Sequence, residues 1–176
     1  MDNAWGGLRA LLARRRVALG FVVAAAAVVL ARPTWRSWTE GFVAAVVGEA
    51  IRIWAAGHLE KGREVTTSGP YRWTRHPLYV GSSVIAIGVL LAARSPVLAA
   101  VASVYLVATL TAAISAEEAH LREKFGGAYD RYERGHGAST VRAFSFERAM
   151  RNREYRAVIG LIGGFLILAL KVTFTL

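Results

Sequence analysis

The chain has 176 residues, of which 55% are hydrophobic and 19% charged, and its mean hydropathy of +0.37 makes it more apolar than an ordinary soluble domain. It contains no cysteine, which excludes a disulfide framework and a thiolate metal site. The net charge of +10 does not indicate a nucleic-acid partner, because the basic residues flank apolar runs as they do in membrane proteins.

Five long apolar stretches predict an all-α protein, an integral membrane bundle of about five transmembrane helices. They are residues 17–31, 41–56, 78–93, 96–115 and 155–176. A spanning helix needs about 20 mostly apolar residues, and flanking residues can extend the shorter stretches. The first stretch follows three arginines, as in a signal peptide. Bulky and charged residues follow it in place of a small-residue cleavage site, so we interpret it as a retained membrane helix.

The Lys and Arg residues predict the orientation of the bundle. Most of the 22 lie before residue 17, in 57–77 and in 116–156, whereas the alternate loops hold only Arg32, Arg36 and Arg94. By the positive-inside rule the N-terminus is cytoplasmic and the C-terminus lies outside. The composition, rich in Ala, Val and Arg, is typical of a GC-rich bacterium. We therefore expect a bacterial inner-membrane protein with its loops, and any site they form, on the cytoplasmic side.

Turn residues predict how the stretches connect. Arg94-Ser95-Pro96 is a short turn, so the third and fourth helices form an antiparallel hairpin. Helical periodicity continues past the fourth apolar stretch to Phe125, where Gly126-Gly127 ends it. A polar connector follows, with a short amphipathic helix at 144–154. No separate soluble domain is evident, so we treat 1–176 as one domain, with N-terminal helices in 1–47 and a connector and last helix in 135–176.

Arg75-His76-Pro77 is the first candidate for chemistry. Proline is favoured at the first position of a helix, which places His76 near the helix start and predicts free amides at residues 80–82. Gly81 would let another group approach the backbone closely. A helix start with free donors favours carboxylates and other electron-rich groups. Alternatively, Arg75 is an ordinary interface anchor and His76 a fortuitous cap.

Two acidic pairs are the next candidates. Glu117 and Glu118 are costly at the inner end of a membrane helix unless paired or solvated, and only one of them can point squarely into a site. Glu49 and Arg52 lie three residues apart on one face of the second helix. An ionisable pair within a membrane helix suggests a functional site. The alternatives are surface ion pairs for the glutamates and snorkelling to the interface for Arg52.

Tyr129 and Tyr132 lie three residues apart and are suited to stacking on a ligand or donating hydrogen bonds to it, although interface aromatics would show the same pattern. The histidines at 58, 120 and 136 show no ligand spacing with one another or with the carboxylates. We therefore expect no metal site.

These signals occur in a specific order: GEAIRIWA, then GPYRWTRHPLYVG, then EEAHLREKFGGAYDRY. In this order they resemble the isoprenylcysteine carboxyl methyltransferase family of integral-membrane enzymes, which is related to phospholipid N-methyltransferases. The resemblance covers residues 48–134, the motif-bearing core. It implies S-adenosylmethionine as cofactor and a lipophilic small molecule or lipid as substrate, beside membrane lipids as partners.

The resemblance also assigns residues to roles. It implies that Arg52 is catalytic, with Glu49 beside it in the matching element. The pattern Arg-His-Pro-x-Tyr-x-Gly followed by Glu-Glu implies a cofactor site, and an aromatic element follows it. The residues so implied in cofactor binding are Arg75, His76, Pro77, Tyr79, Gly81, Glu117, Glu118, Tyr129 and Tyr132.

The chemistry of S-adenosylmethionine agrees with this set. Its carboxylate needs cationic or N–H donors, its ammonium and sulfonium need carboxylates, and its adenine needs a flat apolar surface. The expected hairpin returns both motifs to the same end of the bundle. At about 1.5 Å of rise per residue, the residues between His76 and Glu117 are enough for one helix to cross the bundle and the next to come back.

The acceptor stays open between a carboxylate, an amine and a thiol. A carboxylate, as in isoprenylcysteine, needs orientation by Arg52 and desolvation, whereas an amine must first lose a proton to a base such as Glu49. Two other functions stay open: an NADPH-dependent membrane reductase of the sterol-reductase type, and a non-catalytic accessory protein.

Overall fold

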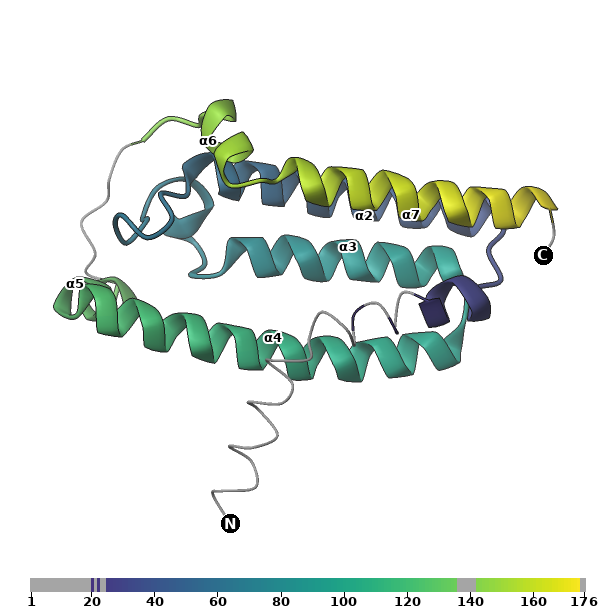
Figure 1. Ribbon diagram of the computed structural model, residues 1–176, viewed down its shortest axis with the longest axis horizontal. Helices are drawn as coiled ribbons and strands as arrows, with labels where there is room; N and C mark the ends of the chain where they lie inside the picture. Colours follow the sequence, from purple (N-terminus) through teal and green to yellow (C-terminus); the bar gives the residue numbers. More distant parts are fainter. Residues whose placement is uncertain (1–19, 21, 23–24, 136–141, 175–176) are drawn as a thin grey trace, which may run out of the picture.

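The computed structural model describes residues 20, 22, 25–135 and 142–174, and the regular structure in those ranges is all helical, as predicted. The long helices run side by side in Figure 1, and the short elements gather at one end. The long helices are α2 (Trp35–His58), α3 (Pro77–Ala93), α4 (Pro96–Phe125) and α7 (Tyr155–Phe174). The short elements are η1 (Gly69–Arg72), α5 (Gly127–Glu133) and α6 (Phe146–Arg151).

Two helices in the described ranges, α4 and α7, are long and apolar enough to cross a membrane, and α3 is apolar but shorter. Only 11% of the most apolar window of α4 or of α7 is buried, so these helices differ from the buried core helix of a soluble protein. Exposed valines at positions 97, 101, 104 and 107 line α4, and large aliphatic side chains are exposed along α7. These faces suit lipid, and the protein is a helical membrane bundle.

The first predicted span, 17–31, lies partly outside the described residues, and within it residues 25–30 are helical. The second predicted span lies within α2, which is long enough to cross but carries Glu49 and Arg52 toward its C-terminal end.

The helix boundaries follow local sequence signals. A capping box of Thr34 and Ser37 begins α2, and Pro77 is the first residue of α3. Ser95 accepts a hydrogen bond from the amide of Leu98 at the start of α4. The predicted α3–α4 hairpin and the continuation of α4 to Phe125 are confirmed. Gly126, with a φ of 49°, ends α4 in a backbone region that favours glycine.

Helices α2 and α3 approach each other through glycines. A Cβ added to Gly48 would lie 2.7 Å from the carbonyl oxygen of Gly81, and one added to Gly88 would lie 2.5 Å from the carbonyl oxygen of Gly41. Fully buried Ala45 and Ala92 pack in the same interface. Small side chains at such positions let membrane helices pack backbone against backbone.

Gly48→Ala is expected to lower thermal stability, because the new methyl group would meet the backbone of α3, which cannot move without separating the two helices. The expected loss is about 1–3 kcal/mol. Gly160→Ala on α7 is the matched control, since a Cβ there meets no described atom within 4 Å, and helix propensity alone predicts a neutral or stabilising change. Thermal unfolding in detergent, followed by circular dichroism, checks both variants. Equal melting temperatures for the two would contradict the packing argument.

The segment around α6 caps the C-terminal end of α2. Asn152 donates to the carbonyl oxygens of Ala56 and Leu59 at 2.8 and 2.9 Å. The backbone amide of Ser145 donates to the carbonyl oxygen of Gly57 at 3.1 Å. The last carbonyls of a helix have no partner within it, so these bonds hold the connector against α2. The predicted amphipathic helix at 144–154 is shorter than expected, because residues 152–154 form the turn that leads into α7.

Candidate functional site

A cavity of about 620 Å³ opens at the end of the bundle where the short elements gather. Its walls come from the C-terminal end of α2 and the loop after it, the start of α3, the C-terminal end of α4, and α5. This volume is within the range of small-molecule sites, about 300–1,000 Å³. The predicted site residues on its wall are Arg52, Arg75, His76, Pro77, Tyr79, Glu117, Tyr129 and Tyr132.

The start of α3 and the C-terminal end of α4 meet through one carboxylate. Oε1 of Glu118 lies 3.1 Å from Nε2 of His76 and 3.2 Å from Nη1 of Arg75. The geometry thus brings the two halves of the predicted motif together across 42 residues of sequence. His76 is the N-cap residue of α3, and Pro77 follows at the first helical position, as predicted.

Glu133 on α5 extends this network. It accepts hydrogen bonds from Arg122 at 2.8 Å and from Arg75 at 2.6 Å, and these two bonds lower the pKa of Glu133. Arg75, which lines the cavity, therefore connects α4 and α5. The sequence analysis did not identify Glu133, although it directly follows Tyr132 in the aromatic element.

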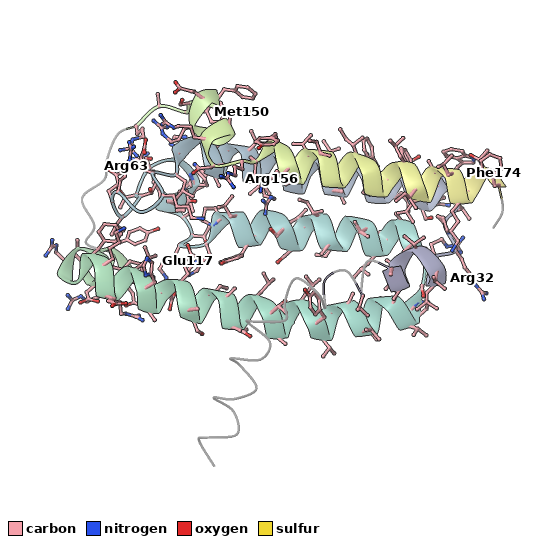
Figure 2. All side chains as sticks on the ribbon, in the orientation of Figure 1. Arg32, Arg63, Glu117, Met150, Arg156 and Phe174 are labelled. Atoms are coloured by element: carbon pink, nitrogen blue, oxygen red, sulfur yellow. The ribbon has the colours of Figure 1, made fainter. Side chains whose placement is uncertain are left out.

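The two adjacent glutamates of α4 differ in their surroundings. Glu118 is engaged by Arg75 and His76 and is not on the cavity wall, whereas Glu117 is exposed and lines the cavity. Among the described residues, no hydrogen bond or ion pair reaches the Glu117 carboxylate. Figure 2 shows Glu117 on the side of α4 that faces the start of α3. Glu117 is therefore the carboxylate available to a ligand.

The aromatic wall is built from two elements. The Tyr132 hydroxyl donates to the Tyr71 carbonyl oxygen at 2.7 Å, and the Tyr129 ring lies 6.2 Å from the Tyr132 ring, centroid to centroid. Tyr129 is only 1% exposed, yet its buried hydroxyl has no hydrogen-bond partner in the part of the chain described. Burial of Tyr129 raises its pKa, so the hydroxyl stays a donor at neutral pH.

Burial also raises the pKa of Tyr132 from its ordinary value of 10.0 to about 12. The folded state disfavours the ionised ring, so the contribution of Tyr132 to stability is complete below pH 10.0 and is lost as the pH rises toward 12. We expect the melting temperature of the wild-type protein to fall more steeply between pH 10 and 12 than that of Tyr132→Phe, which cannot ionise there. Parallel pH profiles for the two proteins would contradict this assignment.

Arg52 reaches the cavity from α2 and is held by polar side chains of three segments. Its Nε lies 2.6 Å from Oε1 of Glu154 and 3.7 Å from Oε2 of Glu49, and its Nη1 donates to the Ser82 hydroxyl. Both carboxylate oxygens of Glu49 are buried without a hydrogen-bond partner among the residues described. The expected pairing of Glu49 with Arg52 is thus present, but Glu154 is the closer carboxylate.

Sequence reasoning missed Glu154. It stands in a connector otherwise rich in arginine, and its proximity to α2 depends on how α6 docks. The signal available in the sequence was an acidic residue directly before an apolar span, which alone does not identify a partner.

The structure places two other predicted features away from the cavity wall. Gly81 lies in the α2–α3 interface, where an added Cβ would meet the Arg52 side chain at 2.6 Å. The expectation of a free amide at residue 80 is wrong. Because His76 caps the helix, the amides of Tyr79 and Val80 already bond to the His76 carbonyl oxygen at 3.0 and 3.1 Å.

The histidines outside the Arg-His-Pro motif have separate surroundings. Nδ1 of His58 lies 3.2 Å from the Ser68 hydroxyl, His120 lines the cavity, and His136 lies outside the described residues. Within the described ranges, no three His, Asp or Glu side chains are grouped so as to hold a metal ion.

Comparison with known proteins identifies similar sequences. The model of the family described as phospholipid methyltransferase matches residues 16–128. This family of integral-membrane methyltransferases includes the isoprenylcysteine carboxyl methyltransferases. The nickel-cobalt-cadmium resistance protein NccN of Alcaligenes xylosoxydans xylosoxydans is 32% identical over 106 residues, which are 57% of this chain and 49% of that protein. The chain thus spans about half the length of the curated relative it matches. No solved structure matches the chain.

Proposed function

The chain belongs to the phospholipid methyltransferase family of membrane methyltransferases, and from that premise we propose that it transfers a methyl group from S-adenosylmethionine to a lipophilic acceptor. The observation that carries the proposal is the cavity lined by Arg75 and His76, which Glu118 of α4 holds in place from behind the wall. Residues of each family motif line this cavity, although α4 and α5 are distant in sequence from α2.

The cavity wall has groups that fit this cofactor. The Tyr129 hydroxyl is buried without a partner in the described ranges and could donate to a bound group. Glu117 lines the cavity, and its carboxylate, which no other described residue pairs with, is available to a cation. Tyr79 and Tyr132 offer aromatic surface for adenine, and Arg75 a cation for the cofactor carboxylate. When bound, S-adenosylmethionine supplies an electrophilic methyl group on a positively charged sulfur.

On the acceptor side, we assign Arg52 to orient the nucleophile. Its planar guanidinium is suited to gripping a carboxylate with two N–H groups, as an isoprenylcysteine-like acceptor would require. A lipid amine would need to lose a proton first, and Glu49, whose carboxylate oxygens have no hydrogen-bond partner within the described residues, is the nearby base for that step. A thiol acceptor is a third class. In each case exclusion of water and correct orientation supply the rate enhancement.

The proposed location of the site is the cytoplasmic face of a bacterial inner membrane. The cavity is lined by the loop after α2 and by the C-terminal part of α4, and these segments carry the basic residues Lys61, Arg63, Arg72, Arg75, Arg122 and Lys124. Loops rich in Lys and Arg remain on the cytoplasmic side of the membrane.

The deciding experiment compares two cofactors on the purified full-length protein in detergent. Radiolabelled S-adenosylmethionine and NADPH are tested for binding, and the protein is then incubated with methyl-labelled S-adenosylmethionine and a bacterial lipid extract. Binding of S-adenosylmethionine with label in a lipid, identified by mass spectrometry, would support the proposal. Binding of NADPH alone would instead indicate a reductase, and binding of neither would indicate an accessory protein.

A further inference from the structure

We infer that Glu154 is a positioning residue for methyl transfer, which fixes the guanidinium of Arg52 at the cavity wall. The inference rests on the proposed function. Glu154 is 6% exposed, and its Oε1 lies 2.6 Å from Nε of Arg52. It does not line the cavity, and it lies beyond residues 16–128, which the family model matches. The inference therefore gives the C-terminal connector a part in the site.

The bonds of Arg52 determine how its guanidinium lies. Glu154 accepts from Nε and the Ser82 hydroxyl accepts from Nη1, so partners on two segments bind two nitrogens of one planar group. Two such bonds fix the plane of the fork. Within the described part of the chain no bond is made by Nη2. Because Arg52 lines the cavity, its remaining N–H groups are the ones that can reach an acceptor.

The backbone around Glu154 is itself held in place. Asn152 binds two carbonyl oxygens at the end of α2, and Arg153 adopts a left-handed φ of 62° that turns the chain from α6 into α7. The amide of Glu154 donates to the Ala149 carbonyl oxygen at 3.2 Å. The carboxylate is thus presented to α2 from a fixed turn, as a positioning group requires.

Glu49 and Glu154 compete for the guanidinium of Arg52. Oε2 of Glu49 lies 3.7 Å from the same Nε, and the oxygens of Glu49 have no hydrogen-bond partner in the described ranges. Without the charge of Glu154, Glu49 becomes the stronger partner and draws the guanidinium along α2. A misplacement of about 1 Å can cost on the order of 10²-fold in rate. Loss of Glu154 should consequently lower turnover without affecting the residues of the cavity wall that we assign to the cofactor.

The test uses Glu154→Gln in the full-length protein, with Glu147→Gln as the matched control. Glu147 lies in the same connector, but its side chain is 81% exposed and pairs only with Arg151, at 3.4 Å, among the residues described. The assay measures methyl transfer from labelled S-adenosylmethionine into vesicles of bacterial lipid extract, and cofactor binding is measured separately. We expect Glu154→Gln to lower kcat by at least about 10-fold with KM for S-adenosylmethionine changed by less than about two-fold. Glu147→Gln should match wild type.

A second pair of proteins separates positioning from a structural role. Lysine has no planar fork, so in an Arg52→Lys background Glu154→Gln should change kcat by less than about two-fold. If Glu154→Gln does not fold, Glu154→Asp takes its place, because its shorter side chain moves the carboxylate away from Nε of Arg52. The same loss of kcat with an unchanged KM for S-adenosylmethionine is then expected.

The outcomes distinguish the inference from the proposed function. An unchanged kcat in Glu154→Gln, an equal loss in the lysine background, or a parallel loss of cofactor affinity would overturn the inference alone. A wild-type protein that binds S-adenosylmethionine weakly or transfers no methyl group would overturn the proposed function, and the inference with it.

Discussion

Arg52→Ala is expected to reduce methyl transfer by about 10²–10³-fold while leaving the affinity for S-adenosylmethionine within about two-fold of wild type. The reason is that Arg52 lines the cavity on the α2 side, whereas the groups assigned to the cofactor lie on α3, on the loop before it, on α4 and on α5. Removing the guanidinium removes the group that orients the acceptor but leaves in place the residues assigned to the cofactor. Initial rates of methyl transfer, with cofactor binding measured separately, check the two parts of this prediction.

The substitution also leaves Glu49 and Glu154 as two buried carboxylates without their cation, which costs stability. Melting temperatures and the double variant Arg52→Ala/Glu154→Gln control for this effect, because the double variant removes one of the uncompensated charges. Arg36→Ala is the matched arginine control, since Arg36 lies on the same helix with a side chain that is 90% exposed and paired to Glu40. Near-normal turnover in Arg52→Ala would show that Arg52 has no part in orienting the acceptor.

The helix boundaries could be predicted because their signals are local. Pro77, Pro96 and Gly126 each restrict or permit a particular backbone conformation, whatever the rest of the chain does. The α3–α4 hairpin followed from the short turn between them, and the hairpin in turn predicted that His76 would return close to the glutamates of α4. This part of the site depends on chain geometry that a single sequence contains.

The remaining contacts depend on how helices rotate and dock, which local signals do not determine. Spacing on a helix predicted that only one of Glu117 and Glu118 would face the site, but not which one, because this depends on the rotation of α4. Gly81 was expected beside the cofactor because glycine permits close approach; the close neighbour is α2. Glu154 meets Arg52 only because the α6 segment docks on the end of α2 through Asn152.

The same rotation of α4 gives the second large effect, on cofactor affinity. Glu117→Gln is expected to weaken binding of S-adenosylmethionine by about 10–100-fold, because a hydrogen bond to a charged group contributes about 1.5–3 kcal/mol and each 1.4 kcal/mol is about tenfold in affinity. The Glu117 carboxylate lines the cavity and has no partner among the described residues, so its charge is available to a cationic ligand. Equilibrium binding of labelled cofactor to the detergent-purified protein measures the change.

Two neighbouring glutamates on α4 serve as controls for this prediction. Glu123→Gln removes an exposed carboxylate of the same helix away from the cavity wall and should leave affinity unchanged. Glu118→Gln removes the bridge to Arg75 and His76, so it should lower the melting temperature as well as the affinity. Glu117→Gln, by contrast, breaks no described contact and should bind the cofactor weakly with an unchanged melting temperature. Both variants remove one negative charge, but only Glu117 lies on the cavity wall, so only Glu117→Gln should lose affinity for S-adenosylmethionine. Equal affinities for Glu117→Gln and Glu123→Gln would show that Glu117 does not face the bound cofactor.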